Sequence, residues 1–324
     1  MSAAPVSFHD LHPTADDLAA DVLTGFSRAQ KSIPPKYFYD AEGSRLFDAI
    51  TELPEYYPTR TETAMLREYA DEIAQKAGTG HLLVEPGSGS CSKARLLFEG
   101  LQPCAYVPMD ISRDHLRVAA KEVAVEFPWL EVHAACTDFT RLMALPPTSP
   151  EGRRLAFFPG SSIGNFDPDA AVGFLGMIAD MVGPGGRLLI GVDLKKDKAV
   201  LEAAYDDAQG VTAAFNLNLL ARINRELGAD FDLALWRHKA LYNEAQGRIE
   251  MHLVSRVVQQ VSLLGQTFRF DGGETIHTEN SYKYSVAGFR DLASQAGFTT
   301  DTVWVDDDRL FSLHLLQTGS ADEG

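Results

Sequence analysis

A glycine-rich turn and the acidic residues that follow it are spaced as a nucleotide-like ligand would require. In LLVEPGSGSCSKARLLFEG (residues 82–100), Glu85 closes an apolar run, Gly87 and Gly89 lie in the turn, and a helical pattern follows. Glycine lacks a Cβ and the first N–H groups of a helix are unpaired, so the backbone can approach a ligand closely. Asp110 comes about 21 residues after Gly89, where an acidic side chain can accept both hydroxyls of a ribose.

A third acidic position adds a possible contact to a base. Asp138 and Phe139 follow the next apolar run, and such a pair could accept an adenine amino group and cover its ring. Each carboxylate taken singly could equally cap a helix or lie solvated in a loop. Their order along the chain favours the ligand site.

The elements that must position these residues alternate between strand and helix. Apolar runs predict strands at 82–86, 105–112, 130–139, 153–166 and 185–194, separated by helical patterns at 112–125 and 168–182. This alternation predicts a parallel sheet with helices on both faces, and ligands bind such sheets beyond the carboxyl ends of the strands.

Two classes of protein compete for such a sheet, a dinucleotide oxidoreductase and a methyltransferase that uses S-adenosylmethionine. The oxidoreductase fingerprint needs a third glycine at the start of the helix, where this chain has Cys91, Ser92 and Lys93. The chain also ends in two strands, 299–305 and 311–317, joined by the acidic turn DDDR. An antiparallel hairpin at this end of the sheet favours the methyltransferase.

The alternation breaks between Leu194 and Tyr284, which indicates an inserted second domain. Residues 211–227 read as a helix ended by Gly228, and 248–263 and 266–270 read as strands of a meander. The N-terminal part combines a helix at 14–28, beginning at Thr14, with an aromatic segment. We therefore expect a cofactor-binding domain at 61–196 and 286–324, and a smaller α+β substrate-binding domain at 1–60 and 197–285.

Composition restricts the partners. The chain of 324 residues carries 45 acidic against 29 basic residues, a net charge of −16, which disfavours nucleic acid and anionic membranes. Cys91, Cys104 and Cys136 lack the spacing of a metal site or a disulfide framework, so we expect reduced, buried or semi-buried thiols and no metal. Without a secretory or membrane-spanning pattern, we expect a cytoplasmic monomer with a small-molecule substrate.

Long blocks of this sequence resemble the ergothioneine-pathway L-histidine Nα-methyltransferase family. The blocks are PPKYFYDAEGSRLFDAITELPEYYPTRTE, EPGSGSCSK, PGSSIGNFDP, AYDDAQGVTAAFNLNLLARINREL, RIEMHL and HTENSYKYS, spread over nearly the whole chain. The resemblance implies a Rossmann-like class I methyltransferase sheet with a smaller substrate domain. It also implies transfer of three methyl groups from S-adenosyl-L-methionine to the α-amine of histidine, which gives hercynine.

The resemblance also implies roles for individual residues. Tyr56, Asn165 and Tyr205 would hold the substrate amine and carboxylate, near the carbonyl of Gly160, and Tyr39 and Phe47 would line the transfer chamber. Tyr39 and Asn165 would be the catalytic residues. Glu279, Ser281 and Met251 would contact the imidazole. The residues matching cofactor positions are Gly87, Lys93, Asp110, Asp138 and Phe139, to which we add Glu85 and Gly89 from the turn.

The residues themselves are compatible with an imidazole site. If ETIHTENSYKY forms a strand, Glu279 and Ser281 lie on one face, and a carboxylate that accepts and a hydroxyl that donates complement a neutral imidazole. A polar strand edge is the alternative, Met251 could be plain core, and Asn165 could be a turn former. Methylation of another amino acid or amine, and a regulator that only binds S-adenosylmethionine, are the competing functions.

Overall fold

The structure is a computed structural model that describes residues 6–11, 15–141 and 143–319. The described chain separates into two compact units. The large unit contains the first strand, Pro58–Lys195 and the chain from Lys283 onward. The small unit contains the chain from the first helix to Tyr57 together with Lys196–Tyr282. Each unit is therefore assembled from segments that lie far apart in the sequence.

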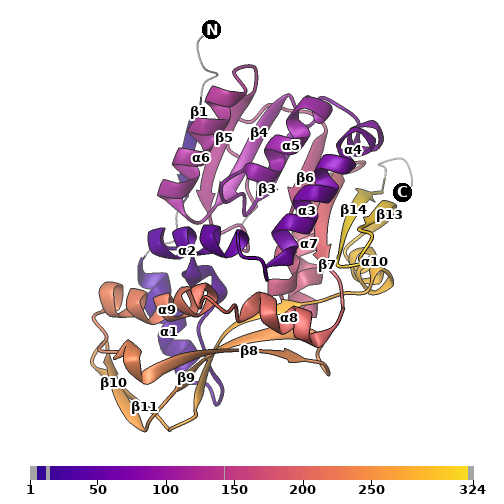
Figure 1. The fold of residues 1–324 in the computed structure, drawn as a ribbon. Helices are drawn as coiled ribbons and strands as arrows, with labels where there is room; N and C mark the ends of the chain where they lie inside the picture. Colours follow the sequence, from indigo (N-terminus) through magenta and orange to yellow (C-terminus); the bar gives the residue numbers. More distant parts are fainter. Residues whose placement is uncertain (1–5, 12–14, 142, 320–324) are drawn as a thin grey trace. The chain divides into compact units, whose positions relative to one another are not determined.

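The large unit is built on a single eight-stranded sheet (Figure 1). Its strands are β1 (Val6–Leu11), β3 (Leu82–Pro86), β4 (Ala105–Asp110), β5 (Glu131–Thr137), β6 (Arg154–Phe158), β7 (Arg187–Asp193), β13 (Phe298–Val305) and β14 (Phe311–Thr318). Their order is β1-β5-β4-β3-β6-β7-β14-β13, with β14 antiparallel to both β7 and β13 and all other pairs parallel. The predicted Rossmann-like class I sheet with an antiparallel C-terminal hairpin is confirmed.

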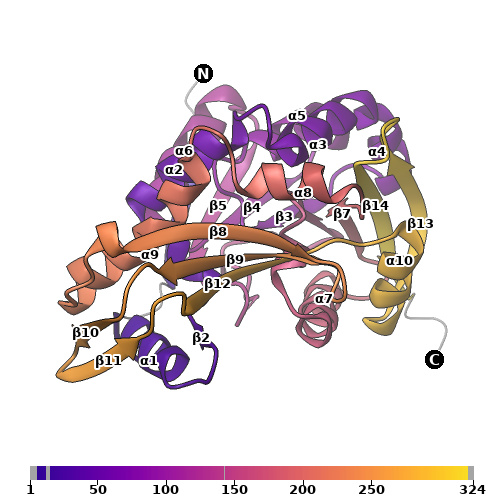
Figure 2. The same ribbon diagram turned by 60° about the horizontal axis from the view of Figure 1, so that its bottom comes forward.

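The central strands are buried along their whole length because helices cover both faces of the sheet. Every residue of β3 and β4 is buried, as is typical of parallel strands between helical layers. Figure 2 shows α3, α4 and α5 on one face and α7 and α10 on the other. The helices of this unit are α3 (Tyr57–Glu68), α4 (Ala70–Ala77), α5 (Ser92–Leu101), α6 (Arg113–Glu126), η2 (Ser162–Asn165), α7 (Pro168–Val182) and α10 (Val286–Gln295).

Strand β1 was not predicted from the sequence. It lies at the edge of the large sheet and pairs in parallel with β5, from Val6 opposite Val132 to Leu11 opposite Thr137. The expected boundary placed residues 1–60 in the smaller domain, whereas β1 belongs to the large sheet. A six-residue edge strand needs few apolar positions, so its sequence signal is weak.

The small unit combines a curved four-stranded sheet with a separate hairpin (Figure 2). Its strands are β2 (Lys31–Ser32), β8 (Trp236–Asn243), β9 (Arg248–Ser255), β10 (Gln259–Leu263), β11 (Gln266–Phe270) and β12 (Thr275–Tyr282). The sheet has the order β2-β12-β9-β8, and β10 pairs with β11. The helices are α1 (Ala15–Phe26), η1 (Pro35–Phe38), α2 (Ala41–Thr51), α8 (Lys198–Tyr205), α9 (Val211–Leu227) and η3 (Leu233–Leu235).

Several local expectations in this unit are met. Helix α9 ends at Gly228, which takes the left-handed conformation with φ 67°. The strand expected at 248–263 is divided into β9 and β10, which belong to different sheets, so the expected meander is wrong; the strand expected at 266–270 is β11, and β8 was not predicted. The helix expected at 14–28 corresponds to α1, and the start proposed at Thr14 lies outside the described residues.

The two ends of the small unit's second segment are fixed to each other within the large unit. Leu194 forms a parallel bridge with Tyr284, and the Lys195 N–H donates to the Tyr284 carbonyl at 2.9 Å. The Lys283 ammonium pairs with Asp193 at 2.8 Å, with both side chains buried. The chain thus leaves the large sheet and returns to it at adjacent points.

Candidate cofactor-binding and substrate-binding residues

The glycine turn between β3 and α5 has a backbone that most residues cannot adopt. Gly87 and Gly89 have φ angles of 69° and 50°, and Cys91 at the start of α5 has 58°. A Cβ at Gly87 would lie 3.2 Å from the ring of Phe139. The absence of a side chain therefore lets Phe139, a residue predicted to cover the adenine, lie directly against the turn.

Asp110 links the end of β4 to the same turn. Its carboxylate accepts the Gly89 N–H at 2.9 Å and the Ser112 N–H at 2.8 Å. Burial raises the pKa of Asp110, and these two backbone hydrogen bonds oppose that effect. Because a carboxylate oxygen can accept more than one hydrogen bond, Asp110 can hold the turn and still accept ligand hydroxyls.

Asp138 and Phe139 follow β5 as expected. Asp138 is buried, and its Oδ1 accepts the Thr140 hydroxyl at 2.5 Å and the Thr140 N–H at 3.2 Å. The Phe139 ring lies 6.3 Å from Phe158 and 6.1 Å from Phe174, measured between ring centroids. Phe139 thus packs against two aromatic side chains and against the glycine turn.

Glu85 lies inside β3, with one strand residue after it, and its side chain is buried. The Tyr106 hydroxyl on β4 donates to its carboxyl group. Burial raises the pKa of Glu85 to about 8, although the hydrogen bond from Tyr106 and the charge of Lys93 act in the opposite direction. The raised pKa favours the protonated form of Glu85, which can donate a hydrogen bond.

The loop after β6 places Gly160 and Asn165. Gly160 and Ser161 both have left-handed backbones, with φ angles of 79° and 55°. The Ser161 hydroxyl accepts the Asp193 N–H from the end of β7 at 2.8 Å, and the Ser161 carbonyl accepts the Gly164 N–H at 2.9 Å. These bonds anchor η2, whose last residue is Asn165.

Lys93, at the start of α5, is paired with a residue that the sequence analysis missed. Its ammonium lies 2.5 Å from Glu62 on α3, and Glu62 also accepts the Gly160 N–H. Glu62 is the last residue of the family-like block at 34–62, but no role was expected for it, because one glutamate on an amphipathic helix looks like a surface residue in the sequence. The predicted Lys93 and Gly160 are therefore brought together by an unpredicted carboxylate.

The small unit joins four predicted aromatic residues into a continuous series. Ring centroids lie 5.6 Å apart between Tyr39 and Phe47, 6.3 Å between Phe47 and Tyr56, and 6.2 Å between Tyr56 and Tyr205. All three pairs meet edge to face. The Phe215 ring on α9 packs against both Tyr39 and Phe47, at centroid distances of 5.9 and 6.0 Å. We call Tyr39, Phe47, Tyr56 and Tyr205 the aromatic series; ring faces of this kind are attractive to cations.

Tyr205 is held at both its side chain and its backbone. Its hydroxyl lies 2.8 Å from the Ser281 hydroxyl on β12, and both side chains are buried. Its carbonyl lies 2.8 Å from Nε2 of His238, whose Nδ1 lies 2.9 Å from the Asn216 amide. Burial lowers the pKa of His238. A neutral ring that donates from Nε2 and accepts at Nδ1 satisfies both contacts, so His238 holds the Tyr205 carbonyl, a contact that the sequence did not reveal.

The register of β9 and β12 determines on which face of the sheet the three residues predicted to contact the imidazole lie. Glu279 is the direct cross-strand partner of Met251, and Ser281 is the partner of Ile249. Cross-strand partners share a face, as do residues two apart on one strand, so Met251, Glu279 and Ser281 lie on one face of the sheet. A bulge between His277 and Glu279 precedes them.

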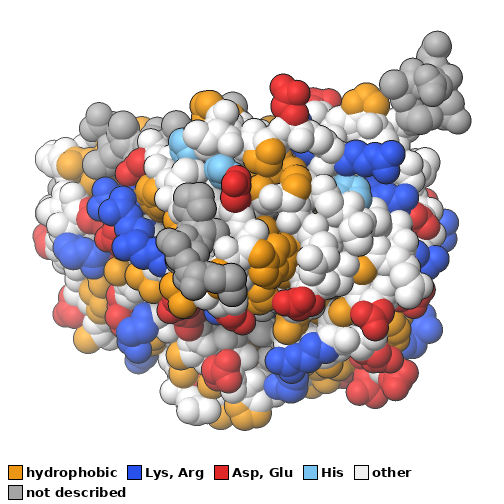
Figure 3. Space-filling model, turned by 90° about the horizontal axis from the view of Figure 1, so that it is seen from above, with side chains coloured by type: hydrophobic (Ala, Val, Ile, Leu, Met, Phe, Trp, Pro, Cys, Tyr) orange, Lys and Arg blue, Asp and Glu red, His pale blue; other side chains and the backbone are white. Residues whose placement is uncertain are grey.

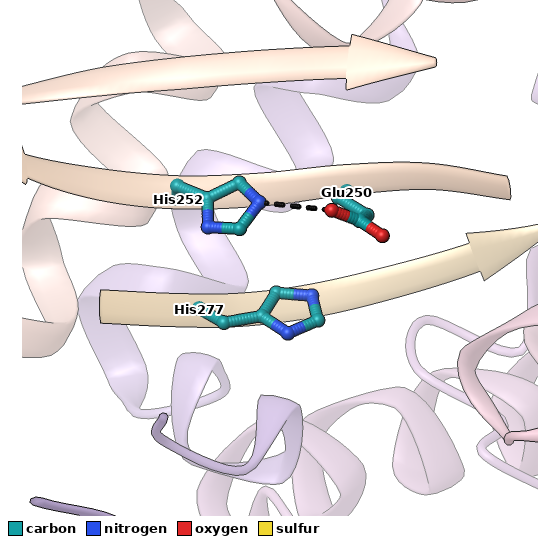
Figure 4. Close-up of side chains that lie close together, drawn as sticks. All are labelled: Glu250, His252 and His277. Carbon is teal, nitrogen blue, oxygen red and sulfur yellow. Dashed lines mark hydrogen bonds and ion pairs between the residues drawn. The ribbon is translucent and has the colours of Figure 1, made fainter. Parts of the chain in front are cut away.

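Three side chains of the ligand types that metals use meet on the same strands (Figure 4). One ligand atom each of Glu250, His252 and His277 lies within 4.8 Å of the others. However, Glu250 accepts from Arg248 at 2.8 Å, and Nε2 of His277 lies 3.0 Å from the Glu279 carbonyl. A cation would compete with Arg248 for the Glu250 charge. We therefore interpret this cluster as a set of structural contacts that stabilise the pairing of β9 with β12.

The surface, the helices and the cysteines bear on the expectations from composition. Figure 3 shows one face of the molecule, on which acidic and basic side chains are interspersed. Among the residues that the structure describes, no helix combines the length and the apolar character needed to cross a membrane. Cys91 and Cys136 are buried free thiols, whereas Cys104 is exposed, so the expectation that all three are at least semi-buried is wrong for Cys104.

The strand order, the reversed final hairpin and the glycine turn define the class as S-adenosylmethionine-dependent methyltransferases. A family described as "Histidine-specific methyltransferase, SAM-dependent" matches residues 18–318, and the chain belongs to this family. Its cofactor is thus S-adenosyl-L-methionine, and it is a methyltransferase of the histidine-specific type.

Relatives extend over nearly the same length. The chain is 44% identical over 307 residues to a histidine N-alpha-methyltransferase of Mycolicibacterium smegmatis, covering 93% of this chain and 95% of that protein. It is 43% identical over 304 residues to the protein of the same name from Mycobacterium tuberculosis, covering 92% and 94%. It is 31% identical over 295 residues to ergothioneine biosynthesis protein 1 of Neurospora crassa, covering 88% of this chain and 33% of that protein.

Proposed function

We propose that this protein transfers three methyl groups in succession from S-adenosyl-L-methionine to the α-amine of L-histidine, which gives hercynine for ergothioneine biosynthesis. The names of the relatives support the α-amine and the pathway. The observation that carries the proposal is the buried hydrogen bond between Tyr205 and Ser281, on the strand where Glu279 faces Met251.

That hydrogen bond can fix the orientation of the Ser281 hydroxyl proton. A neutral imidazole offers one N–H donor and one acceptor nitrogen, so it needs one partner that accepts and one that donates. The Glu279 carboxylate accepts. When the Tyr205 hydroxyl donates to the Ser281 oxygen, the Ser281 proton is directed to the other ring nitrogen. Three side chains of the small unit thereby match histidine and reject amino acids without a ring donor and acceptor.

The transfer itself depends on positioning. The amine lone pair forms the new N–C bond while the S–C bond of the sulfonium breaks, and S-adenosylhomocysteine leaves with the electron pair. The amine must be neutral for its lone pair to react, and an α-amine with a pKa near 8 has a usable neutral fraction at neutral pH. We assign Tyr56, Asn165, Tyr205 and the Gly160 carbonyl to hold the amine and carboxylate, where the Tyr205 oxygen can still accept while its proton goes to Ser281. Tyr39 or water accepts the released proton.

The aromatic series suits the later steps. Each methylation removes an N–H donor, and the final product is a quaternary ammonium that donates no hydrogen bond. Ring faces stabilise such a cation by about 0.5–2 kcal/mol each through cation–π contact. The same chamber can therefore hold the free, monomethyl and dimethyl amines in turn.

Mass spectrometry of reactions with S-adenosylmethionine and each of the twenty amino acids tests the proposal. We expect gains of one, two and three methyl groups on histidine alone, and a large loss of activity in Glu279→Ala. Glu244→Ala, which removes an exposed carboxylate from the same unit, is the matched control. Methylation of a different amino acid would replace the substrate, and binding of the cofactor without methylation would favour a regulator.

The proposal includes a cytosolic monomer. The negative charge and the small-molecule substrate support it. Light scattering during size-exclusion chromatography measures the oligomeric state, and a dimeric mass would reject this part of the proposal.

A further inference from the structure

Glu62 is a fully buried carboxylate in the large unit that takes no direct part in the proposed methyl transfer. Its side chain has no exposed surface, and its Oε2 lies 2.5 Å from the Lys93 ammonium. Both of its oxygens accept the Gly160 N–H, at 2.8 and 3.0 Å. One carboxylate therefore connects a residue of the cofactor turn with the loop that carries Gly160 and Asn165.

The sheet is shaped to admit this carboxylate. A Cβ at Gly191, in the middle of β7, would lie 1.9 Å from Oε1 of Glu62. A central strand normally disfavours glycine, which weakens the strand and leaves no side chain to pack. Here the missing side chain makes the space for Glu62, so the position of the carboxylate is fixed by backbone on one side and by Lys93 on the other.

The Lys93 ammonium can bind Glu62 and the carboxylate of the cofactor at the same time. An ammonium has three donors, and Glu62 uses the one directed at it, while 15% of the Lys93 side chain remains exposed. S-adenosylmethionine carries a carboxylate on its methionine part, which a lysine at a helix start can bind. A buried ion pair contributes little net stability, which favours a role in orientation over one in folding alone.

We propose that Glu62 is a positioning residue that orients the Lys93 ammonium toward the carboxylate of the cofactor and fixes the Gly160 peptide on the substrate side. This inference rests on the proposed roles of Lys93 and Gly160. Through Lys93 and Gly160, the buried Glu62 carboxylate thereby positions both the cofactor and the substrate without contacting either.

Two substitutions separate the two roles. Glu62→Gln keeps an oxygen that can accept the Gly160 N–H but removes the charge opposite Lys93. We expect a rise of about 10–100-fold in the KM for S-adenosylmethionine and in the Kd for S-adenosylhomocysteine, with the KM for histidine little changed. Glu62→Ala also removes the acceptor, so the KM for histidine should rise as well.

A cycle with Lys93→Met tests whether Glu62 acts through Lys93. In the Lys93→Met background, Glu62→Gln should change the Kd for S-adenosylhomocysteine by less than twofold. The double variant holds no buried unpaired charge, so it remains informative if Glu62→Gln alone does not fold. Asp301→Asn, which removes the partner of Arg187 at 2.8 Å in the same unit, is the control and should bind as wild type.

Unchanged Kd and KM values in Glu62→Gln, or wild-type affinity in the double variant, would overturn the inference even if the unfolding temperature falls. The binding assay needs no methyl acceptor. If wild-type protein fails to methylate histidine while Glu62→Gln still weakens S-adenosylhomocysteine binding, the proposed function fails and the role of Glu62 stands.

Discussion

Replacing Ser281 by alanine removes the hydroxyl that we propose donates to the substrate imidazole, together with its 2.8 Å contact to Tyr205. Both side chains are buried, at 3% and 8% exposure, so water has little access to replace either bond. Loss of a hydrogen bond at such a site costs about 1–3 kcal/mol. Applied to the transition state, this corresponds to a decrease in kcat/KM for histidine of roughly 5–150-fold.

Initial rates of S-adenosylhomocysteine formation at varied histidine measure the effect. Ser281→Ala, Tyr205→Phe and the double variant form a cycle, and we expect the double variant to lose less than the sum of the single losses, because the two hydroxyls act on each other. Ser255→Ala is the matched control. It removes a buried hydroxyl of the same unit that donates to the Val257 carbonyl at 2.8 Å.

The reasoning is refuted if Ser281→Ala and Ser255→Ala lower the free energy of unfolding alike and both leave kcat/KM for histidine within twofold of wild type. Strictly additive losses in the cycle would refute the idea that Tyr205 orients the Ser281 hydroxyl. A direct contact between Ser281 and the substrate would still be compatible with that result.

Three further predictions concern other residues. His238→Phe removes the donor to the Tyr205 carbonyl and should raise the KM for histidine about tenfold with the KM for S-adenosylmethionine unchanged, as steady-state kinetics would measure. Asp110→Asn should weaken S-adenosylhomocysteine binding about tenfold or more in calorimetry, whereas unchanged affinity would exclude the ribose contact. Burial lowers the pKa of His314 to about 3, below its value near 6.5 in the unfolded chain. The unfolded state therefore binds this proton first as the pH falls, and stability is lost from pH 6.5 down to about 3 by roughly 1.4 kcal/mol per unit. Urea unfolding of His314→Gln between pH 7 and pH 5 should show a slope shallower by about 1 kcal/mol per pH unit, because the unfolded histidine is only partly protonated above pH 6.5, and an identical slope would contradict the assignment.

The large sheet could be predicted because its strands carry strong local signals. Parallel strands buried on both faces read as continuous apolar runs, and β3, β4 and β7 each end near a glycine or an acidic residue. The final hairpin was marked by its acidic turn. By contrast, β8 reads Trp-Arg-His-Lys-Ala-Leu-Tyr-Asn, and only Trp236 of it is buried. A strand of that composition is indistinguishable from a loop in the sequence.

The residues that the sequence analysis missed act through packing between distant segments. Glu62 looks like a surface residue until β7 and the Gly160 loop close around it. His238 lies among polar neighbours, and its role follows from α8 and α9 packing above β8, which no local pattern reveals. The predicted residues of the small unit were found through long specific sequence blocks, and the structure adds their order in the aromatic series and the link from Tyr205 to Ser281.

The clamp formed by Asp193, Leu194, Lys283 and Tyr284 has a consequence for how the chain can fold and diversify. The contacts among these four residues hold the two ends of the segment Lys196–Tyr282 together. The entropic cost of closing this long segment is therefore offset by contacts that lie outside the segment. The segment can then unfold locally, or change its length and sequence through evolution, without pulling the strands of the large sheet apart. A sheet closed in this way can carry different inserted segments while its own register stays the same.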